Sequence, residues 1–382
     1  MCYTQNRFKA LISACVMSLI ATAGWSQSLT WLGTLGGWYS EAFGVSADGA
    51  VVVGVAPNAE GRWRAFRWTA SGGMQDLGTL GGYDSWAYGV SADGAVVVGR
   101  AYNAAGDWHA FRWTASGRMQ DLGTLGGCCS EAWGVSADGA VVVGGSYNAA
   151  GDWHAFRWTA SGGMQDLGTL PGGTWSGAYG VSADGAVVVG EAENAAGQGR
   201  AFRWTASGGM QDLGTLGGTW SVAYGVSADG AVVVGAARNA EGRWRAFRWT
   251  ASGGMQDLGT LGGNESYAYG VSADGSVVVG WAEIAPYQYR AFRWTASGGM
   301  EDLNTTYANL LTLGSYLGRA TAISPDGRYI VGYGRNAATW RNEAFLLDTR
   351  PRCPLYGDVN GDRVVDDVDL LIVLFNFGNR CP

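Results

Sequence analysis

The C-terminal end of the chain carries oxygen-bearing side chains at the spacing of a calcium-binding loop. Counted from Asp358, they stand at loop positions 1, 3, 5, 9 and 12, and the main-chain carbonyl of position 7 completes the set. The predicted ligands are Asp358, Asn360, Asp362, Val364, Asp366 and Asp369. Such oxygens are what Ca²⁺ prefers, so the spacing predicts one calcium ion. Arg363 at position 6 and Asp at position 12 depart from the usual Gly and Glu, which predicts weak binding.

Four cysteines remain if the first 26 residues are removed as a signal. Cys353 and Cys381 bracket the predicted calcium loop, and we expect a disulfide between them, because the tail is too small for a core of its own. Cys128 and Cys129 are adjacent, and a bridge between neighbours would be strained. A vicinal disulfide, two free thiols and an intermolecular bridge all stay open for this pair.

Aromatic side chains stand in segments that differ between otherwise similar stretches of the chain. Trp and Tyr beside Asn, Asp and Arg suit the recognition of sugars or peptides, and variable loops on a rigid scaffold are where binding usually occurs. The candidate ligand-binding residues are Trp38, Tyr39, Tyr83, Trp86, Trp175, Trp220, Trp63, Trp108, Trp153 and Trp244. The alternative is that these aromatic residues seal the gaps between neighbouring structural units.

Residues for catalysis are few. The two histidines, His109 and His154, occupy the same position of two repeats, where other copies have Arg. No Gly-x-Ser-x-Gly or His-Glu-x-x-His motif is present, and near-identical repeats lack the asymmetric group of side chains that chemistry needs. An acid/base site would have to use divergent residues, namely Glu283, Arg319, Arg335 and Glu343, for which surface charge is the simpler interpretation. We therefore assign no catalytic residue.

A repeat of about 45 residues must position the aromatic residues and the histidines. Gly-Val-Ser-Ala-Asp-Gly recurs with its Asp at 48, 93, 138, 184, 229 and 274, and a weaker copy has Asp326. Val-Val-Val-Gly, Ala-Phe-Arg-Trp and Leu-Gly-Thr-Leu recur in step, each bounded by turn residues, which is a strand pattern. Four strands in each of seven repeats predict an all-β, seven-bladed β-propeller with four-stranded blades. A β-solenoid is the alternative.

The order of the strings predicts how the ring closes. One Leu-Gly-Thr-Leu strand (29–35) precedes the first repeat, and the last repeat ends at 343–348 without one. Pairing the two removes both exposed edges. We also expect an Arg67–Asp76 cross-strand pair and its five equivalents, which Leu346 and Trp31 replace by an apolar pair where the chain ends meet.

Two faces of the propeller follow from the strand order. If the Ser-Ala-Asp-Gly strand is innermost, the nearly constant Asp-Gly and Ser-Gly-Gly turns share one face, here called the turn face. The divergent loops and their aromatic residues then share the opposite face, here called the loop face.

Composition and the N-terminal residues restrict the class of partner and the cellular location that we expect. The net charge is −7, which argues against a nucleic-acid partner, and 12% aromatic residues with 15% charged residues argue against disorder. Residues 1–26 have a short basic start, an apolar stretch and a small-residue cleavage site, which predicts a secretory signal. We expect a signal peptide at 1–26, a propeller at 27–349 and a calcium-binding tail at 350–382. The mature protein should be secreted or on the cell surface, with no transmembrane segment.

Two families resemble parts of this chain. The repeats resemble bacterial extracellular HAF repeats, seen here as His109-Ala110-Phe111 and His154-Ala155-Phe156, and that resemblance implies a propeller. The tail resembles one half of a type I dockerin, with Asp-x-Asn-x-Asp and then Asp369-Leu370. It implies a link to polysaccharide degradation and a cohesin-like or cell-surface partner. Dockerins normally carry two such segments, and one is present here.

The sequence thus favours an exported, non-catalytic binding or scaffold protein. Its ligand, a polysaccharide or a peptide, would lie on the loop face, and its tail would dock or anchor it. One alternative is a polysaccharide-acting enzyme, a glycosidase or lyase, with its site in the divergent last blade. Another is a purely structural surface protein.

Overall fold

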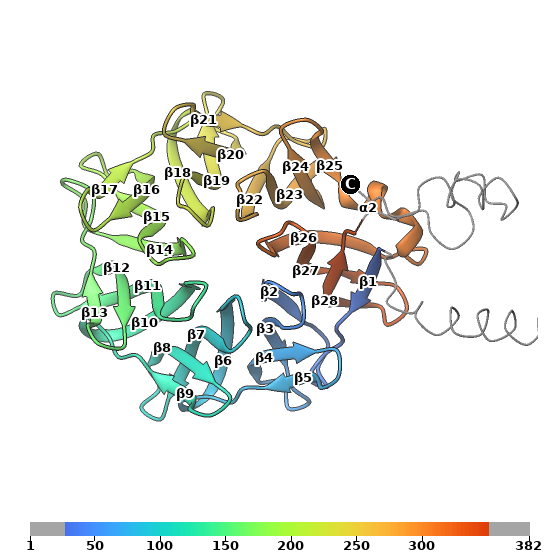
Figure 1. Ribbon diagram of the computed structural model, residues 1–382, viewed down its shortest axis with the longest axis horizontal. Coiled ribbons are helices and arrows are strands. Elements are labelled where there is room, and N and C mark those ends of the chain that lie inside the picture. Colours follow the sequence, from blue (N-terminus) through green and yellow to red (C-terminus); the bar gives the residue numbers. More distant parts are fainter. Residues whose placement is uncertain (1–26, 351–382) are drawn as a thin grey trace, which may run out of the picture. The chain divides into compact units, whose positions relative to one another are not determined.

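The repeats form seven sheets, each of four antiparallel strands, arranged as blades around a central channel (Figure 1). The computed structural model describes residues 27–350, in which residues 29–347 form one compact unit. The predicted seven-bladed propeller is therefore confirmed, and a solenoid is excluded. The predicted signal and all but the first residue of the predicted tail lie outside the described residues.

Blades 1 to 6 follow the chain from the channel outward. Their strands are β2 (Glu41–Val45), β3 (Val52–Pro57), β4 (Trp63–Thr69) and β5 (Gly73–Asp76); β6 (Gly81–Val90), β7 (Val96–Asn103), β8 (Trp108–Thr114) and β9 (Arg118–Asp121); β10 (Gly126–Val135), β11 (Val141–Asn148), β12 (Trp153–Thr159) and β13 (Gly163–Asp166); β14 (Ser176–Val181), β15 (Val187–Glu193), β16 (Gly199–Thr205) and β17 (Gly209–Asp212); β18 (Gly217–Val226), β19 (Val232–Asn239), β20 (Trp244–Thr250) and β21 (Gly254–Asp257); and β22 (Ser266–Val271), β23 (Val277–Ala285), β24 (Gln288–Thr295) and β25 (Gly299–Asp302).

Blade 7 joins the two ends of the propeller. Its strands are β26 (Tyr316–Ile323), β27 (Tyr329–Asn336), β28 (Arg341–Asp348) and, outermost, β1 (Ser28–Trp31). The Leu32 N–H donates to the Ala344 carbonyl at 2.9 Å, and the Trp31 ring meets Phe345 edge-on at 6.2 Å. The predicted closure between the chain ends is confirmed. Before blade 7 the chain also forms a short helix, α2 (Leu303–Thr306), and a 3-10 turn, η2 (Ala308–Leu310).

The Ser-Ala-Asp-Gly string recurs because it builds one turn. The Ser46 hydroxyl donates to Asp48 Oδ1 at 2.7 Å and accepts from the Val51 N–H at 2.9 Å, while Asp48 also accepts from the Ala50 N–H. These donors lower the pKa of the Asp48 carboxyl. Gly49 has φ +70°, and the Tyr329 ring occupies the space that a side chain there would need.

The predicted Arg67–Asp76 pairs are wrong by one residue of register. Thr69 faces Gly73, so Arg67 faces Gln75 and Asp76 faces Phe66. The cause is a three-residue loop, Ala70–Gly72, followed by Gly73 at φ +64°, whereas an Arg67–Asp76 pair requires a four-residue turn. The apolar pair expected between Leu346 and Trp31 shifts by the same one residue, and Trp31 contacts Phe345 instead. Arg67 instead donates from Nε to the Gly94 carbonyl of blade 2, and blades 2 to 5 repeat this contact at 3.1–3.3 Å.

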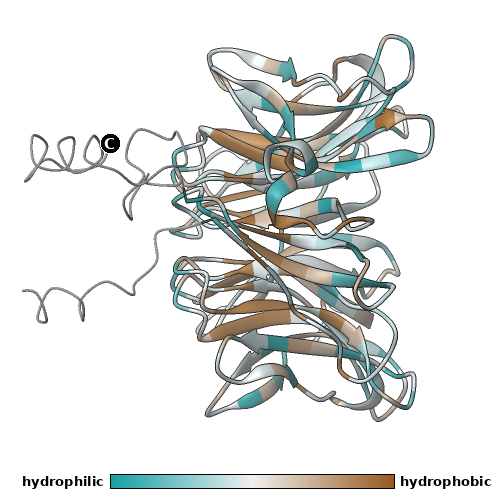
Figure 2. Ribbon diagram, turned by 90° about the vertical axis from the view of Figure 1, so that its right-hand side faces the viewer, coloured by the Kyte–Doolittle hydropathy of each residue, from teal (hydrophilic) through white to brown (hydrophobic). Residues whose placement is uncertain are grey.

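The contact between two consecutive blades, here called a seam, contains the core. One fully buried Phe fills each seam, as Phe111 does between blades 1 and 2, among Val and Ala side chains of both blades. Figure 2 shows hydrophobic segments running through the strands, with hydrophilic residues concentrated toward the edges. Within residues 27–350 no helix has the length and apolar character needed to cross a bilayer.

A buried serine ties each seam except one. In the 1–2 seam Ser85 accepts from the Ala65 N–H at 2.9 Å and donates to the Gly78 carbonyl at 2.6 Å. The equivalent serines accept from the neighbouring blade in the other five seams that carry one, and these are Ser130, Ser176, Ser221, Ser266 and Ser40. In the 6–7 seam Gly318 stands at this position.

Candidate functional site

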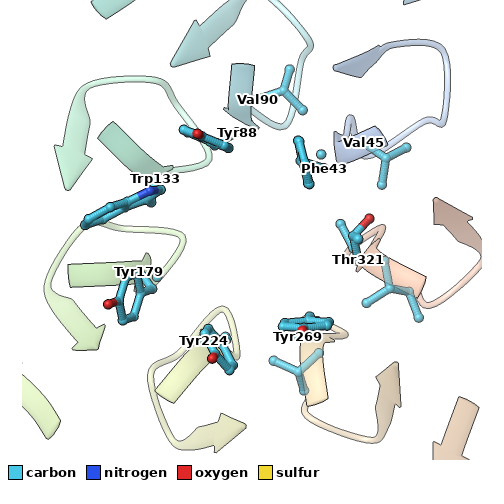
Figure 3. A pocket seen from close by; sticks show the side chains of 18 of the residues that line it. Phe43, Val45, Tyr88, Val90, Trp133, Tyr179, Tyr224, Tyr269 and Thr321 are labelled. Carbon is cyan, nitrogen blue, oxygen red and sulfur yellow. The ribbon is translucent and has the colours of Figure 1, made fainter. Parts of the chain in front are cut away.

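A ring of aromatic side chains lines the central channel. The innermost strand of each of six blades contributes one aromatic residue at the same repeat position, and blade 7 contributes Thr321 (Figure 3). The six are Phe43, Tyr88, Trp133, Tyr179, Tyr224 and Tyr269. Ring centroids of neighbours lie as close as 4.9 Å for Trp133–Tyr179 and 5.0 Å for Tyr224–Tyr269. The cavity they border has a volume of about 620 Å³.

A valine layer lies beyond the aromatic ring on the side of the turn face. Its members follow the aromatic residues by two positions and are Val45, Val90, Val135, Val181, Val226, Val271 and Ile323. Burial raises the pKa of the Tyr179, Tyr224 and Tyr88 hydroxyls, so these remain neutral hydrogen-bonding groups. The channel therefore offers aromatic faces and neutral hydroxyls above an aliphatic layer.

Charged residues stand two positions before the ring, toward the loop face. Arg319 lines the channel with Glu41, and its guanidinium lies 5.1 Å from the Trp281 ring and 5.8 Å from the Tyr333 ring. Burial raises the pKa of Glu41, against the lowering effects of the Tyr39 hydroxyl and Arg319. Arg100 stacks on Trp86 at 4.4 Å and forms an ion pair with Glu131.

Glu191 lacks a cation. It lies on β15 opposite Gly177 and accepts a hydrogen bond from the Trp220 indole at 2.7 Å. No Lys, Arg or His of the described residues forms an ion pair with it. Burial raises the pKa of Glu191 to about 7, against the lowering effect of the Trp220 hydrogen bond.

The structure places the ten predicted aromatic residues on the loop face but not in one site. Trp38 is 59% exposed and Tyr83 is 44% exposed. The others are partly buried in contacts within or between blades: Tyr39 meets Trp63 at 5.9 Å, Trp108 meets Tyr102, Trp153 meets Trp133 and Tyr147, and Trp244 meets Tyr267. Arg100 stacks on Trp86, and the Trp220 indole donates a hydrogen bond to Glu191. The Trp175 main-chain carbonyl accepts from the Glu193 N–H. A ligand role for these residues stays a prediction.

The histidines and cysteines have local partners. His109 and His154 contact Asp121 and Asp166 through Nδ1 at 2.7 and 2.8 Å. Cys128 and Cys129 are unbridged, and their sulfur atoms lie 2.7 Å apart. Burial and the neighbouring thiol raise the pKa of Cys129 to about 12, so it is a poor nucleophile at neutral pH. Within residues 27–350 no three His, Cys, Asp or Glu side chains gather as a metal site.

The divergent residues weighed for catalysis have separate surroundings. Glu343 is buried and accepts from Asn336 and Thr339, and buried Glu283 accepts from the Asn264 N–H at 3.0 Å. Arg335 lies over Trp340. Arg319 is the one of these four that lines the channel cavity.

Sequence reasoning missed the aromatic ring. Its signal is the residue between Ala and Gly-Val-Ser in the first six repeats, which reads Phe, Tyr, Trp, Tyr, Tyr and Tyr, while blade 7 has Thr321 before Ala-Ile-Ser. This residue changes type inside a string that otherwise barely varies. Because a nearly constant string is typical of scaffold, its single variable position does not stand out.

No family model matches the sequence, and no curated protein does. The propeller domain of the Trilobed protease from Pyrococcus furiosus, described as having an open velcro topology, is 10% identical with a TM-score of 0.52, over 81% of this chain and 95% of that chain. A structure from a study of two prolyl endopeptidases is 12% identical with a TM-score of 0.51, over 91% of this chain and 56% of that one. TolB from Acinetobacter baumannii is 10% identical with a TM-score of 0.44, over 83% of this chain and 64% of its own.

The likeness to the first two structures shows the propeller fold alone. The chain spans 64% of the TolB chain and 56% of the endopeptidase chain. The resemblances to HAF repeats and to a dockerin segment stay predictions.

Proposed function

We propose that this chain is an exported, non-catalytic binding protein that takes a carbohydrate at the loop-face mouth of the central channel. The observation that carries the proposal is the aromatic ring, to which six blades each contribute one residue around a cavity of about 620 Å³. Aromatic faces pack against the C–H faces of sugar rings, and the Tyr hydroxyls offer hydrogen bonds at their edges. Few, well-placed polar groups on an apolar wall are typical of a ligand site.

The test is binding of the full chain to a glycan array and a peptide array. Tyr224→Ala should weaken carbohydrate binding about ten-fold or more, the loss expected when a central aromatic contact is removed. Tyr147→Ala is the matched control, because Tyr147 lies outside the channel cavity and packs on Trp153. Binding to peptides alone would replace the proposed ligand class. No binding to either array would favour a purely structural protein.

A polysaccharide-acting enzyme is the second candidate, and Glu191 is the observation that favours it. A carboxyl with a pKa of about 7 near the channel has the property of a general acid. Turnover of any bound glycan that is lost in Glu191→Gln would establish this alternative. Binding without turnover favours the first proposal.

We also propose that the tail binds one calcium ion and docks or anchors the protein, with a Cys353–Cys381 bridge. The support is the ligand spacing alone, from Asp358 to Asp369. Calorimetric titration of the full chain should show one calcium site with Kd of roughly 10⁻⁴–10⁻³ M. Asp358→Ala should abolish it, whereas Asp326→Ala, which removes a turn-face aspartate, should leave it unchanged.

A further inference from the structure

The 6–7 seam differs from the other six seams in what ties it. Gly318 stands where every other seam has a buried serine. The Ala291 N–H, equivalent to the N–H groups that donate to those serines, has no side-chain acceptor among the described residues.

Arg290 also loses the partner that its equivalents have. In blades 1 to 5 the residue at this position contacts an Asp of the outer strand: Arg64 with Asp76 at 3.3 Å, His109 with Asp121, His154 with Asp166, Arg200 with Asp212 at 4.0 Å, and Arg245 with Asp257 at 3.1 Å. In blade 6 the equivalent Asp302 caps α2 and accepts from Asn304. Arg290 forms no ion pair with any described residue; it donates from Nη1 to the Tyr289 carbonyl at 2.9 Å and lies over the Tyr316 ring at 4.8 Å.

A pocket of about 410 Å³ occupies this seam, and Arg290 lines it. Its other polar and aromatic walls include Tyr289, Tyr316, Arg319, Tyr333 and Asn342, and Gly318 forms part of its surface. Two guanidinium groups therefore line the pocket, while its lining contains no carboxylate and no aliphatic side chain.

The acidic residues around the pocket have partners of their own. Glu301 pairs with Arg293 at 2.9 Å, Glu343 is buried with Asn336, and Glu283 accepts from the N–H groups of Asn264 and of Tyr287, which lines the pocket. Glu41 lies on the channel side of Arg319 and accepts from the Tyr39 hydroxyl. Glu41 thus partly balances the positive charge of Arg319, whereas no described carboxylate forms an ion pair with Arg290.

Exposed aromatic residues surround the same seam. Tyr287 is 88% exposed, Trp340 is 73% exposed and Tyr316 is 37% exposed. Tyr287 and Tyr316 line the pocket, and Trp340 contacts Arg335, which faces Tyr316 across β26 and β27. Tyr287 and Tyr316 therefore give the pocket exposed aromatic walls.

We propose that the 6–7 seam pocket binds the carboxylate of an acidic sugar, with Arg290 as its principal partner and Arg319 as the second cation. A guanidinium presents two parallel N–H donors that match a carboxylate. Tyr rings and the Asn342 amide suit the ring face and hydroxyls of a uronic acid. A peptide carboxylate fits less well, since the pocket has no aliphatic wall for side chains. This inference rests on the proposed carbohydrate binding and adds that the bound carbohydrate is negatively charged.

The test is titration of the full chain with oligosaccharides of galacturonate, of mannuronate and guluronate, and of glucuronate-containing repeats. Each is compared with its methyl-esterified or neutral counterpart, and an acidic peptide of equal charge is included. Arg290→Gln should weaken uronate binding by about 10- to 100-fold, the loss expected when a charged hydrogen-bonded partner is removed. Arg245→Gln, at the same position of blade 5, should bind as the wild type does.

The outcomes separate this inference from the proposed function. Uronate binding that is lost in Arg290→Gln and kept in Arg245→Gln supports it. Binding of neutral glycans with no preference for uronates overturns this inference and leaves the proposed function intact. Uronate binding that survives Arg290→Gln, or preference for the acidic peptide, also overturns it. No saccharide binding overturns both.

Discussion

The 5–6 and 6–7 seams use the same repeat positions and differ in which groups are satisfied. In the 5–6 seam Ser266 links the blades and Arg245 contacts Asp257 at 3.1 Å. In the 6–7 seam Gly318 replaces the serine, and Asp302, the residue equivalent to Asp257, bonds Asn304 instead of Arg290. In blades 1 to 5 the residue at the position of Arg290 has an Asp partner, so a guanidinium without a carboxylate partner arises here where a copy departs from the repeat.

Asp326 follows Asp274 by 52 residues, where the other intervals are 45 or 46, and this insertion, which contains α2 and η2, explains the departure. Asn304 donates to Asp302 from both its backbone N–H and its amide, and its side chain also bonds both the N–H and the carbonyl of Leu317. Leu303 and Tyr307 bury their side chains in the core of the 6–7 seam. The insertion thus takes Asp302 for its own cap while it preserves the core beneath the pocket.

The largest expected effect tests whether the two cores are equivalent. Phe292 fills the 5–6 seam and Phe345 the 6–7 seam, and both are 0% exposed. Phe292→Ala and Phe345→Ala should each lower the free energy of unfolding by about 3–5 kcal/mol, through lost burial and a cavity. Denaturant unfolding measures both. A cost for Phe345→Ala below half that of Phe292→Ala would mean that the pocket extends into the core and that the seams differ throughout.

A second departure from the repeat, Glu191, should make stability depend on pH. Its pKa is about 7 in the folded protein against an ordinary value of 4.5, so the folded state binds the proton more tightly. Its contribution to stability is then present below pH 4.5 and is lost as pH rises through 7. Glu191→Gln should remove this decline and gain about 2 kcal/mol at pH 8.

Unfolding at pH 5 and pH 8 checks the Glu191 prediction. The matched control is Glu193→Gln, two residues along the same strand, where hydrogen bonds from Thr174 lower the pKa of the carboxyl. Equal pH dependence in the wild type and Glu191→Gln would contradict the account of an unbalanced carboxyl.

A smaller effect is expected at Arg118, where blade 2 departs from the repeat at its outer turn. Arg118 has φ +56°, whereas the equivalent residue in the other copies of this turn is Gly, as at Gly163 with φ +65°. A side chain is strained in this left-handed conformation. Arg118→Gly should raise the free energy of unfolding by about 0.5–1 kcal/mol, measured by denaturant unfolding. A loss of stability would show that the Arg118 side chain makes contacts that outweigh the strain.

The smallest expected effect tests whether an Arg without a carboxylate partner is sufficient for binding. Asp257→Asn releases Arg245 in blade 5, but Ser266 still links that seam. Stability should change by less than about 1 kcal/mol, as for other exposed ion pairs. Titration with the uronate that binds best should show no second site. A new site at the 5–6 seam would mean that the pocket and the glycine contribute little.

Much of the fold could be predicted because the repeat is regular. The 45-residue period and the unpaired strand at 29–35 were sufficient for seven blades and their closure. The Arg67–Asp76 register could not be predicted reliably, since a three-residue loop with Gly73 in a left-handed conformation and a four-residue turn read alike in sequence. The shift by one residue reassigned Arg67 to the next blade and Asp76 to Arg64.

The candidate site was less predictable, because it depends on departures whose meaning appears only in space. Gly318 and Asp302 are ordinary residues in sequence, and their effect on Arg290 depends on which residues meet across the 6–7 seam. The aromatic loop residues stood out in sequence, yet most of them are partly buried in packing contacts. Variation within a constant string, as at Tyr224, was the better signal and the less visible one.

The most direct test of the 6–7 seam account is a crystal structure of the full chain with the uronate oligosaccharide that binds best. The account predicts a sugar ring in the pocket beside Tyr316, with its carboxylate oxygens within hydrogen-bond distance of the Arg290 guanidinium. A saccharide bound in the channel or at another seam, with the Arg290 pocket unoccupied, would contradict it.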